Sequence, residues 1–85
     1  MMKKYLGKIR IQLRQNILDV QGKAVEQALH AIEFPMMTNV RIGKYVELNL
    51  EAENEEKAFD LIDDASKKLI ANPIIEDYEI EIEEL

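Results

Sequence analysis

Very few side chains in this sequence could do chemistry. The 85 residues include one histidine, His30, one serine, Ser66, and no cysteine. Nucleophilic catalysis needs a nucleophile beside a base, and a zinc site needs several His or Cys ligands at suitable spacing. Ser66 stands next to two lysines rather than in a nucleophile elbow. His30 is flanked on the helix surface by Glu26 and Glu33, which favours a solvated side chain. We therefore predict no catalytic residue, no metal ligand and no cofactor-binding residue in this chain.

The acidic residues are numerous, 17 in all, but the sequence identifies no acid–base pair among them. Asp63 and Asp64 lie together in a helical segment, and Glu79, Glu81 and Glu83 alternate along a strand-like segment. General acid–base catalysis needs a carboxyl group in surroundings that tune its pKa. Both patterns are instead typical of solvated faces.

Arg41, Gly43 and Lys44 form a basic turn that contains glycine. Backbone N–H groups beside a glycine approach anions closely, so this turn could bind a phosphate or a carboxylate. It could equally be a simple hairpin turn, since the glycine spacing of a nucleotide-binding loop is missing. Both interpretations are open at the level of sequence.

The two halves of the chain carry opposite charge. Residues 1–44 hold eight Lys and Arg against three acidic residues, whereas residues 45–85 hold three against fourteen. The overall charge of −6 disfavours nucleic-acid binding, which needs clustered basic residues. No apolar run is long enough to span a membrane, and no signal-peptide pattern is present. We expect a single cytoplasmic domain over residues 1–85, with no nucleic-acid or membrane partner.

Apolar spacing predicts the elements that must position these residues. Odd-numbered residues from 5 to 13 alternate with mostly polar ones, which indicates a half-buried strand. Asp19 is the predicted N-cap of a helix over residues 20–33, which Pro35 ends. The positions expected to be buried on this helix form one stripe: Ala24, Val25, Ala28, Leu29 and Ile32.

The middle of the chain allows two interpretations. Residues 40–42 and 45–50 both alternate, and Gly43 and Lys44 lie between them. They form either a hairpin with a two-residue turn or one long strand with a bulge at Gly43. We favour the hairpin, in which Gly43 takes a positive φ.

A second helix and a last strand complete the chain. Asn54 is the predicted N-cap of a helix that ends near residues 71–73. Tyr78, Ile80 and Ile82 alternate with glutamates and indicate the strand.

This order predicts an α+β protein with the β-α-β-β-α-β, ferredoxin-like (split βαβ) arrangement. In that fold an antiparallel sheet carries two helices on one face, and the last strand lies beside the first. Lys8 and Arg10 would then lie next to Glu79, Glu81 and Glu83 on the open face, meaning the sheet face without helices. Cross-strand pairs of opposite charge contribute about 0.2–1 kcal/mol each. The fold would therefore partly neutralise the two halves.

Four large apolar side chains have no place in that core. Met36 and Met37 follow Pro35 in a loop, and Leu6 and Tyr45 belong to the open face. Exposed apolar surface marks contacts with other chains, and small domains gain stability by oligomerisation. We expect a homo-oligomer, dimer or higher, or docking to a larger protein.

Three segments together resemble a known family. Residues 19–25 (DVQGKAV), 40–48 (VRIGKYVEL) and 69–78 (LIANPIIEDY) are similar to the PurS family, the small subunits of phosphoribosylformylglycinamidine synthase. The resemblance covers essentially the whole chain. One departure is Val20, where the family usually has proline at the first helical position. Because proline pre-sets φ there, its loss should soften the helix start without altering function.

The resemblance implies a role in de novo purine synthesis, in which formylglycinamide ribonucleotide, glutamine and ATP give the amidine. The complex would use ATP, Mg and glutamine, none of them bound by this chain. Its partners would be a large ATP-dependent synthase subunit and a glutaminase subunit, which this non-catalytic chain assembles so that ammonia passes between them. The expected interaction residues lie in the three segments: Asp19, Gly22, Lys23, Arg41, Gly43, Lys44, Asn72, Pro73 and Asp77.

Two other functions are open. A free-standing dimeric regulatory module could bind an anionic purine metabolite through Arg41 and Lys44. A lone enzyme would need a reactive group that the sequence does not offer.

Overall fold

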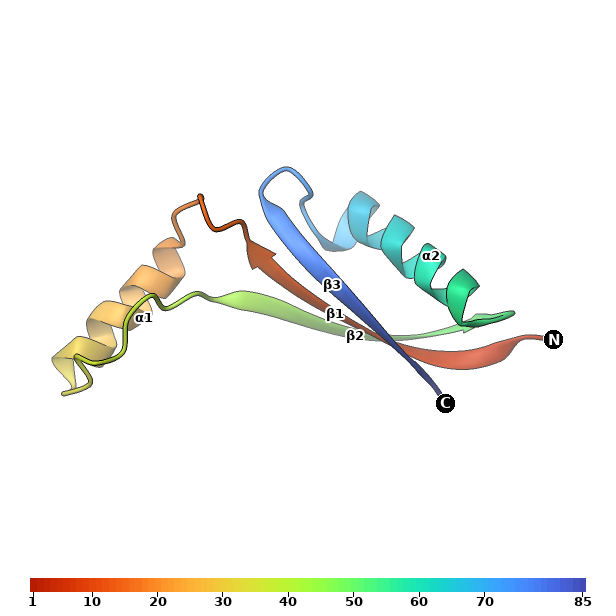
Figure 1. Ribbon diagram of the computed structural model, residues 1–85, viewed down its shortest axis with the longest axis horizontal. Helices are drawn as coiled ribbons and strands as arrows, with labels where there is room; N and C mark the ends of the chain where they lie inside the picture. The colour runs from red at the N-terminus through yellow and green to blue at the C-terminus, as the bar shows by residue number, and fades with distance from the viewer.

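Three antiparallel strands form one sheet, and two helices lie in different directions from it (Figure 1). The computed structural model describes residues 1–85. Its radius of gyration is 16.7 Å, whereas a compact domain of this length has about 12 Å. The molecule is therefore elongated, with dimensions of 55 × 26 × 14 Å. The elements in chain order are β1 (Lys3–Leu13), α1 (Val20–Ala31), β2 (Gly43–Ala52), α2 (Glu55–Ala65), the π-helical turn η1 (Ser66–Ile70) and β3 (Glu76–Glu84).

β1 is the central strand of the sheet. It pairs antiparallel with β2 and with β3, in the order β2-β1-β3. Ile9 lies opposite Val46 on one side and Ile80 on the other, so the apolar positions of all three strands share one face. The predicted pairing of the first strand with the last is confirmed.

α2 covers this apolar face. It approaches β1 so closely at Gly7 that a Cβ atom there would overlap the Ile62 side chain. Only 11 of the 85 residues are buried, so the core is small for the length of the chain. The buried apolar side chains form two clusters between α2 and the sheet: Ile9, Ile11, Ile62 and Ala71, and Tyr5, Ala52 and Ala58.

α1 does not lie on the sheet. It packs against no strand and not against α2, so the prediction of two helices on one face is wrong for α1 (Figure 1). Its apolar residues, which we call the α1 stripe, remain largely uncovered, with Val25 37% and Ile32 62% exposed. The physical reason is that an apolar stripe requires a covering surface without specifying which one. The α1 stripe comprises Ala24, Val25, Ala28, Leu29 and Ile32.

The predicted hairpin is absent. Residues 40–42 form no strand, and β2 begins at Gly43 and pairs with β1 in a continuous register. No glycine has a positive φ. Gly43 is instead a point of close approach, since a Cβ there would lie 2.6 Å from the carbonyl oxygen of Ile11. The order is therefore β-α-β-α-β, and the predicted α+β class with a ferredoxin-like type of antiparallel sheet is confirmed.

The predicted charge pairs join the two halves of the chain on the open face. Lys8 Nζ lies 2.7 Å from a Glu83 carboxylate oxygen, and Arg10 lies 3.2 Å from Glu81. Both pairs are at the surface, where an ion pair contributes at most about 1 kcal/mol. The basic strand β1 is thus partly neutralised by the acidic strand β3.

Both predicted N-caps are confirmed. Asn54 accepts a hydrogen bond from the third amide of α2, and Asp19 accepts one from Gly22 N, each over 2.8 Å. α1 ends two residues earlier than predicted, because Glu33 turns the chain with a φ of 77°. Neither helix is long and apolar enough to cross a membrane.

A hydrogen bond ties α2 to β3. The Tyr78 hydroxyl donates to the Asp63 carboxylate over 2.6 Å. This bond raises the pKa of Tyr78 to about 12. The same bond, together with Lys67, lowers the pKa of Asp63. Because ionisation of Tyr78 removes the donor, the bond stabilises the fold only while the hydroxyl keeps its proton.

We expect Tyr78→Phe to remove a contribution to stability that disappears in alkali. The pKa of a tyrosine in an unfolded chain is about 10. A folded-state pKa of about 12 is raised, so the contribution is complete below pH ~10 and is lost as the pH rises toward 12. Urea unfolding measured between about pH 8 and pH 12 should show the wild type losing its advantage over the variant. A constant difference across this range would contradict the assignment.

Candidate functional site

The nine residues expected to interact gather at one end of the sheet. They belong to residues 19–23, 41–44 and 72–77, which precede or begin α1, β2 and β3. Since β2 and β3 run antiparallel to β1, their first residues lie beside the last residues of β1. The fold therefore brings together three segments that are far apart in the sequence.

Asp19 joins the first turn of α1 to the segment just before β2. Its Oδ1 accepts a hydrogen bond from Gly22 N over 2.8 Å, and its Oδ2 accepts one from Ile42 N over 2.7 Å. These two bonds, with the nearby charge of Arg41, lower the pKa of Asp19 against the opposing effect of burial. The carboxylate is therefore charged at neutral pH, and both of its oxygens are in use.

Arg41 ties the same region to the end of β1. Its guanidinium group donates to three carbonyl oxygens, those of Leu13, Arg14 and Ile17, over 3.0–3.2 Å. We call the group of Asp19, Gly22, Arg41 and Ile42 the α1 joint. Gly22 is required there because a Cβ would overlap the carbonyl oxygen of Val40.

The basic turn is occupied by partners from its own chain. Arg41 is bound to backbone carbonyls, and Lys44 Nζ lies 3.3 Å from a Glu76 carboxylate oxygen. Gly43 contacts the backbone of β1. These contacts count against the anion-binding interpretation and in favour of a structural turn.

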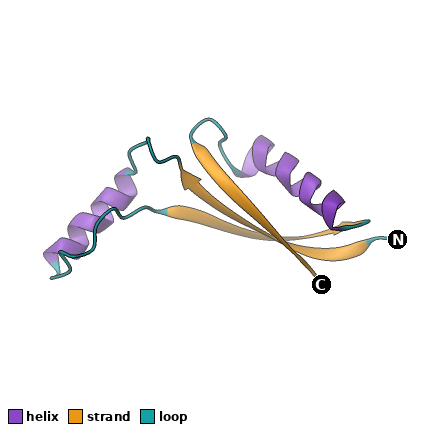
Figure 2. Cartoon of the chain, viewed as in Figure 1, coloured by secondary structure: helices purple, strands orange, loops and turns teal.

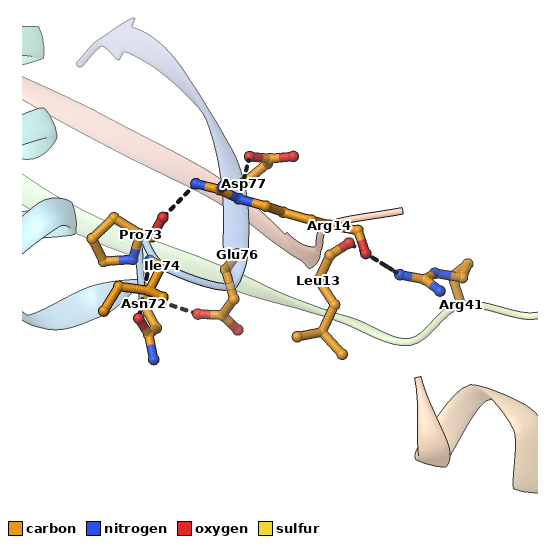
Figure 3. A network of polar contacts seen from close by, with 8 residues as sticks. All are labelled: Leu13, Arg14, Arg41, Asn72, Pro73, Ile74, Glu76 and Asp77. Carbon is orange, nitrogen blue, oxygen red and sulfur yellow. Dashed lines mark hydrogen bonds and ion pairs between the residues drawn. The ribbon is translucent and has the colours of Figure 1, made fainter. Parts of the chain in front are cut away.

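Arg14 links the turn before β3 to the same end of the sheet (Figure 3). Its guanidinium group donates to the carbonyl oxygen of Pro73 and lies 3.4 Å from Asp77. Asn72 Oδ1 accepts from Ile74 N over 3.1 Å and so shapes the turn itself. Arg14 was not among the residues expected from the sequence, and no motif marks it. Its position at the end of the alternating strand was the only available signal.

Lys23 differs from the other expected residues. Its side chain has no hydrogen-bond or ion-pair partner and lies on the exposed first turn of α1. It lines a shallow depression with Glu26, Asn39 and Arg41. Of the charged residues expected to interact, Lys23 is therefore the one whose side chain is available to another molecule.

Apolar surface is exposed along the whole α1 region. The predicted exposure of Met36 and Met37 is confirmed, at 71% and 44%, and Tyr45 is 53% exposed, whereas Leu6 is half-buried. Other large apolar side chains on α1 and its flanking loops are also exposed: Leu18, Val20, Val25, Ile32 and Phe34. This is much of the apolar content of residues 18–37, and the chain itself leaves it in water.

A second apolar surface lies on the sheet beside α2. Ile62 of α2 is buried against the sheet, and its neighbours Asp63 and Leu61 lie on opposite sides of the helix. Asp63 binds Tyr78 of β3. Since β2 and β3 lie on opposite sides of β1, Leu61 is on the β2 side. Leu61 is 56% exposed. We call this surface the β2 flank; it consists of Leu61 and the half-buried β2 residues Val46, Leu48 and Leu50.

The groups that could do chemistry are apart from one another. His30 is exposed on α1, where its Nε2 lies 2.7 Å from the carbonyl oxygen of Met37. Ser66 is buried in η1, and its hydroxyl has no hydrogen-bond partner. No group of three or more His, Asp or Glu side chains is arranged to hold a metal ion.

The sequence matches the family described as PurS, phosphoribosylformylglycinamidine (FGAM) synthase, over residues 7–84. It is 41% identical over 81 residues to the FGAM synthase subunit PurS of Bacillus subtilis, covering 95% of both chains. It is 35% identical to the corresponding subunit of Methanocaldococcus jannaschii, covering 95% of this chain and 98% of the other.

The fold is similar to solved structures over nearly its full length. The TM-score is 0.84 against Bacillus subtilis PurS, with 39% identity over 93% of this chain and 98% of the other. It is 0.86 against a chain in the PurLQS structure from Thermotoga maritima, with 34% identity over 96% and 98% of the two chains.

We expect Gly22→Ala to destabilise the α1 joint. The added methyl group would overlap the backbone of Val40, and overpacking of this kind costs about 1–3 kcal/mol. Thermal unfolding and hydrogen exchange at the Ile42 amide, which Asp19 binds, would measure the loss. Lys23→Ala, at the next and exposed position, is the matched control and should change neither. Equal behaviour of the two variants would show that the close approach at Gly22 is unimportant.

Proposed function

The chain belongs to the PurS family of FGAM synthase subunits of purine biosynthesis, and we propose that it works there as a non-catalytic assembly subunit. It would hold a large ATP-dependent synthase subunit beside a glutaminase subunit so that ammonia passes between them. ATP, Mg and glutamine would then act on the partner subunits. A similar chain in Thermotoga maritima belongs to a PurLQS structure, which supports such partners.

The observation that carries the proposal is the uncovered α1 stripe. A helix that contacts neither the sheet nor α2 of its own chain leaves its apolar side in water. Apolar surface of this extent on a folded protein marks contact with other chains. An enzyme acting alone would instead need reactive groups placed together, but His30 and Ser66 are on different elements, and the Ser66 hydroxyl has no hydrogen-bond partner.

A second copy of the chain is the first partner that we propose. The α1 stripe and the β2 flank are both apolar; within one chain the α1 stripe packs against no other element, and the β2 flank is covered only in part. In a twofold-symmetric dimer, the α1 stripe of each copy would cover the β2 flank of the other. The same contact would then form two times, once for each copy. The small core of the single chain makes this gain in buried area important for stability.

No observation favours the regulatory alternative. That alternative relied on Arg41 and Lys44 to bind the anion, but Arg41 binds three carbonyl groups and Lys44 pairs with Glu76.

We expect Val25→Glu, in the α1 stripe, to give a monomer that no longer supports assembly. Burying an unpaired carboxylate costs several kcal/mol, so the dimer dissociation constant should rise by a factor of about 100 or more. Sedimentation velocity would measure the oligomer. Co-purification with the large synthase and glutaminase subunits, with glutamine and ADP present, would measure assembly.

Gln27→Glu is the matched control, because Gln27 lies about 200° around α1 from Val25 and is exposed. It adds the same charge to the same helix and should leave both measurements unchanged. A wild-type chain that stays monomeric and ignores both larger subunits would overturn the proposal. So would consumption of glutamine or ATP by the isolated chain.

A further inference from the structure

α1 stays away from its own sheet although the same chain offers it a complementary surface. The α1 stripe and the β2 flank are both apolar, and folding back would remove both from water. The connections do not forbid this movement. Residues 14–19 precede α1 and residues 32–42 follow it (Figure 2), and neither connection is shorter than the roughly 2–6 residues that commonly join a helix to the sheet that it covers. Another feature must therefore hold α1 outward.

The carboxylate of Asp19 is suited to this task. One oxygen binds Gly22 N in the first turn of α1, and the other binds Ile42 N immediately before β2. Rotation of α1 relative to β2 would break one of these two bonds. Because Gly22 lacks a side chain, the backbone of the two segments is in direct contact at this point.

Two further contacts restrain the same movement. Arg41 binds the carbonyl groups of Leu13, Arg14 and Ile17, which fixes the segment leaving β1 to the segment entering β2. Glu26, one turn along α1, accepts a hydrogen bond from Val40 N over 3.2 Å. The direction of α1 is thus set by polar contacts at its base, since no packing along its length sets it.

We infer that Asp19 and Arg41 are positioning residues that hold α1 off its own sheet and so present the α1 stripe to a second copy of the chain. Without them, α1 would fold back on the β2 flank of its own chain and close the surface that the dimer needs. The presentation of the α1 stripe to a second copy rests on the proposed homodimer, whereas the orientation of α1 does not.

Asp19→Asn tests this role without removing the helix cap. Asparagine is as good an N-cap as aspartate, so α1 should remain helical by circular dichroism. Its amide has only one acceptor oxygen, and its NH2 group cannot accept from Ile42 N. Arg41→Lys keeps the charge but replaces the planar guanidinium group, whose two terminal nitrogens reach the three carbonyl groups, with a single ammonium nitrogen that cannot reproduce this geometry. Asp64→Asn and Arg10→Lys, at exposed ion pairs elsewhere, are the matched controls.

The orientation of α1 is measured by the distance between two spin labels. The chain has no cysteine, so Gln27→Cys on α1 and Glu51→Cys on β2 can be labelled alone. Diluting labelled with unlabelled protein leaves only distances within one chain. The wild type and both controls should give one narrow distance. Asp19→Asn and Arg41→Lys should give a broad distribution that extends to shorter distances, and their dimer dissociation constants should rise about tenfold or more.

A narrow, unchanged distance in both joint variants would overturn the inference. The proposed homodimer fails by a different result, a monomeric wild type in sedimentation. In that case the distance measurement still decides whether Asp19 and Arg41 hold α1 outward.

Discussion

The Asp19 carboxylate accepts hydrogen bonds from Gly22 N, in the first turn of α1, and from Ile42 N, in the segment that follows α1. These bonds close a loop that contains the whole of α1 and the connection after it. α1 packs on no other element, so its place in the molecule depends on this closure and on the three bonds of Arg41. The elongated shape and the exposed α1 stripe both follow from it.

The parts of the fold that local spacing determines could be predicted from the sequence. The alternation in β1 and β3, the caps at Asp19 and Asn54, and the pairing of Lys8 with the glutamates of β3 are confirmed. Each depends on neighbours in the sequence or on the pairing of two strands. The opposite charges of the two halves of the chain are explained by the fold, because basic β1 lies beside acidic β3.

The errors concern residues whose type fits more than one role. Gly43 suits a turn and a close backbone contact equally well, and only the path of β2 along β1 shows that it makes the contact. The α1 stripe would look the same whether its own sheet or another chain covered it. The hydrogen-bond partners of Asp19 and Arg41 depend on how three loops meet, and for the same reason Arg14 could not be recognised.

The π-helical turn after α2 restricts how the chain length can change. In η1 the amide of Ala71 binds the carbonyl oxygen of Ser66 over 2.9 Å, so this turn holds one more residue than an α-helical turn. That additional residue sets where the chain leaves the helix and starts toward β3. If the turn of residues 71–75 kept its shape, deleting a single residue here would shift β3 by one position against β1, turning the glutamates of β3 inward and its isoleucines outward. A shortened version of this connection would have to lose two residues or rebuild its final strand.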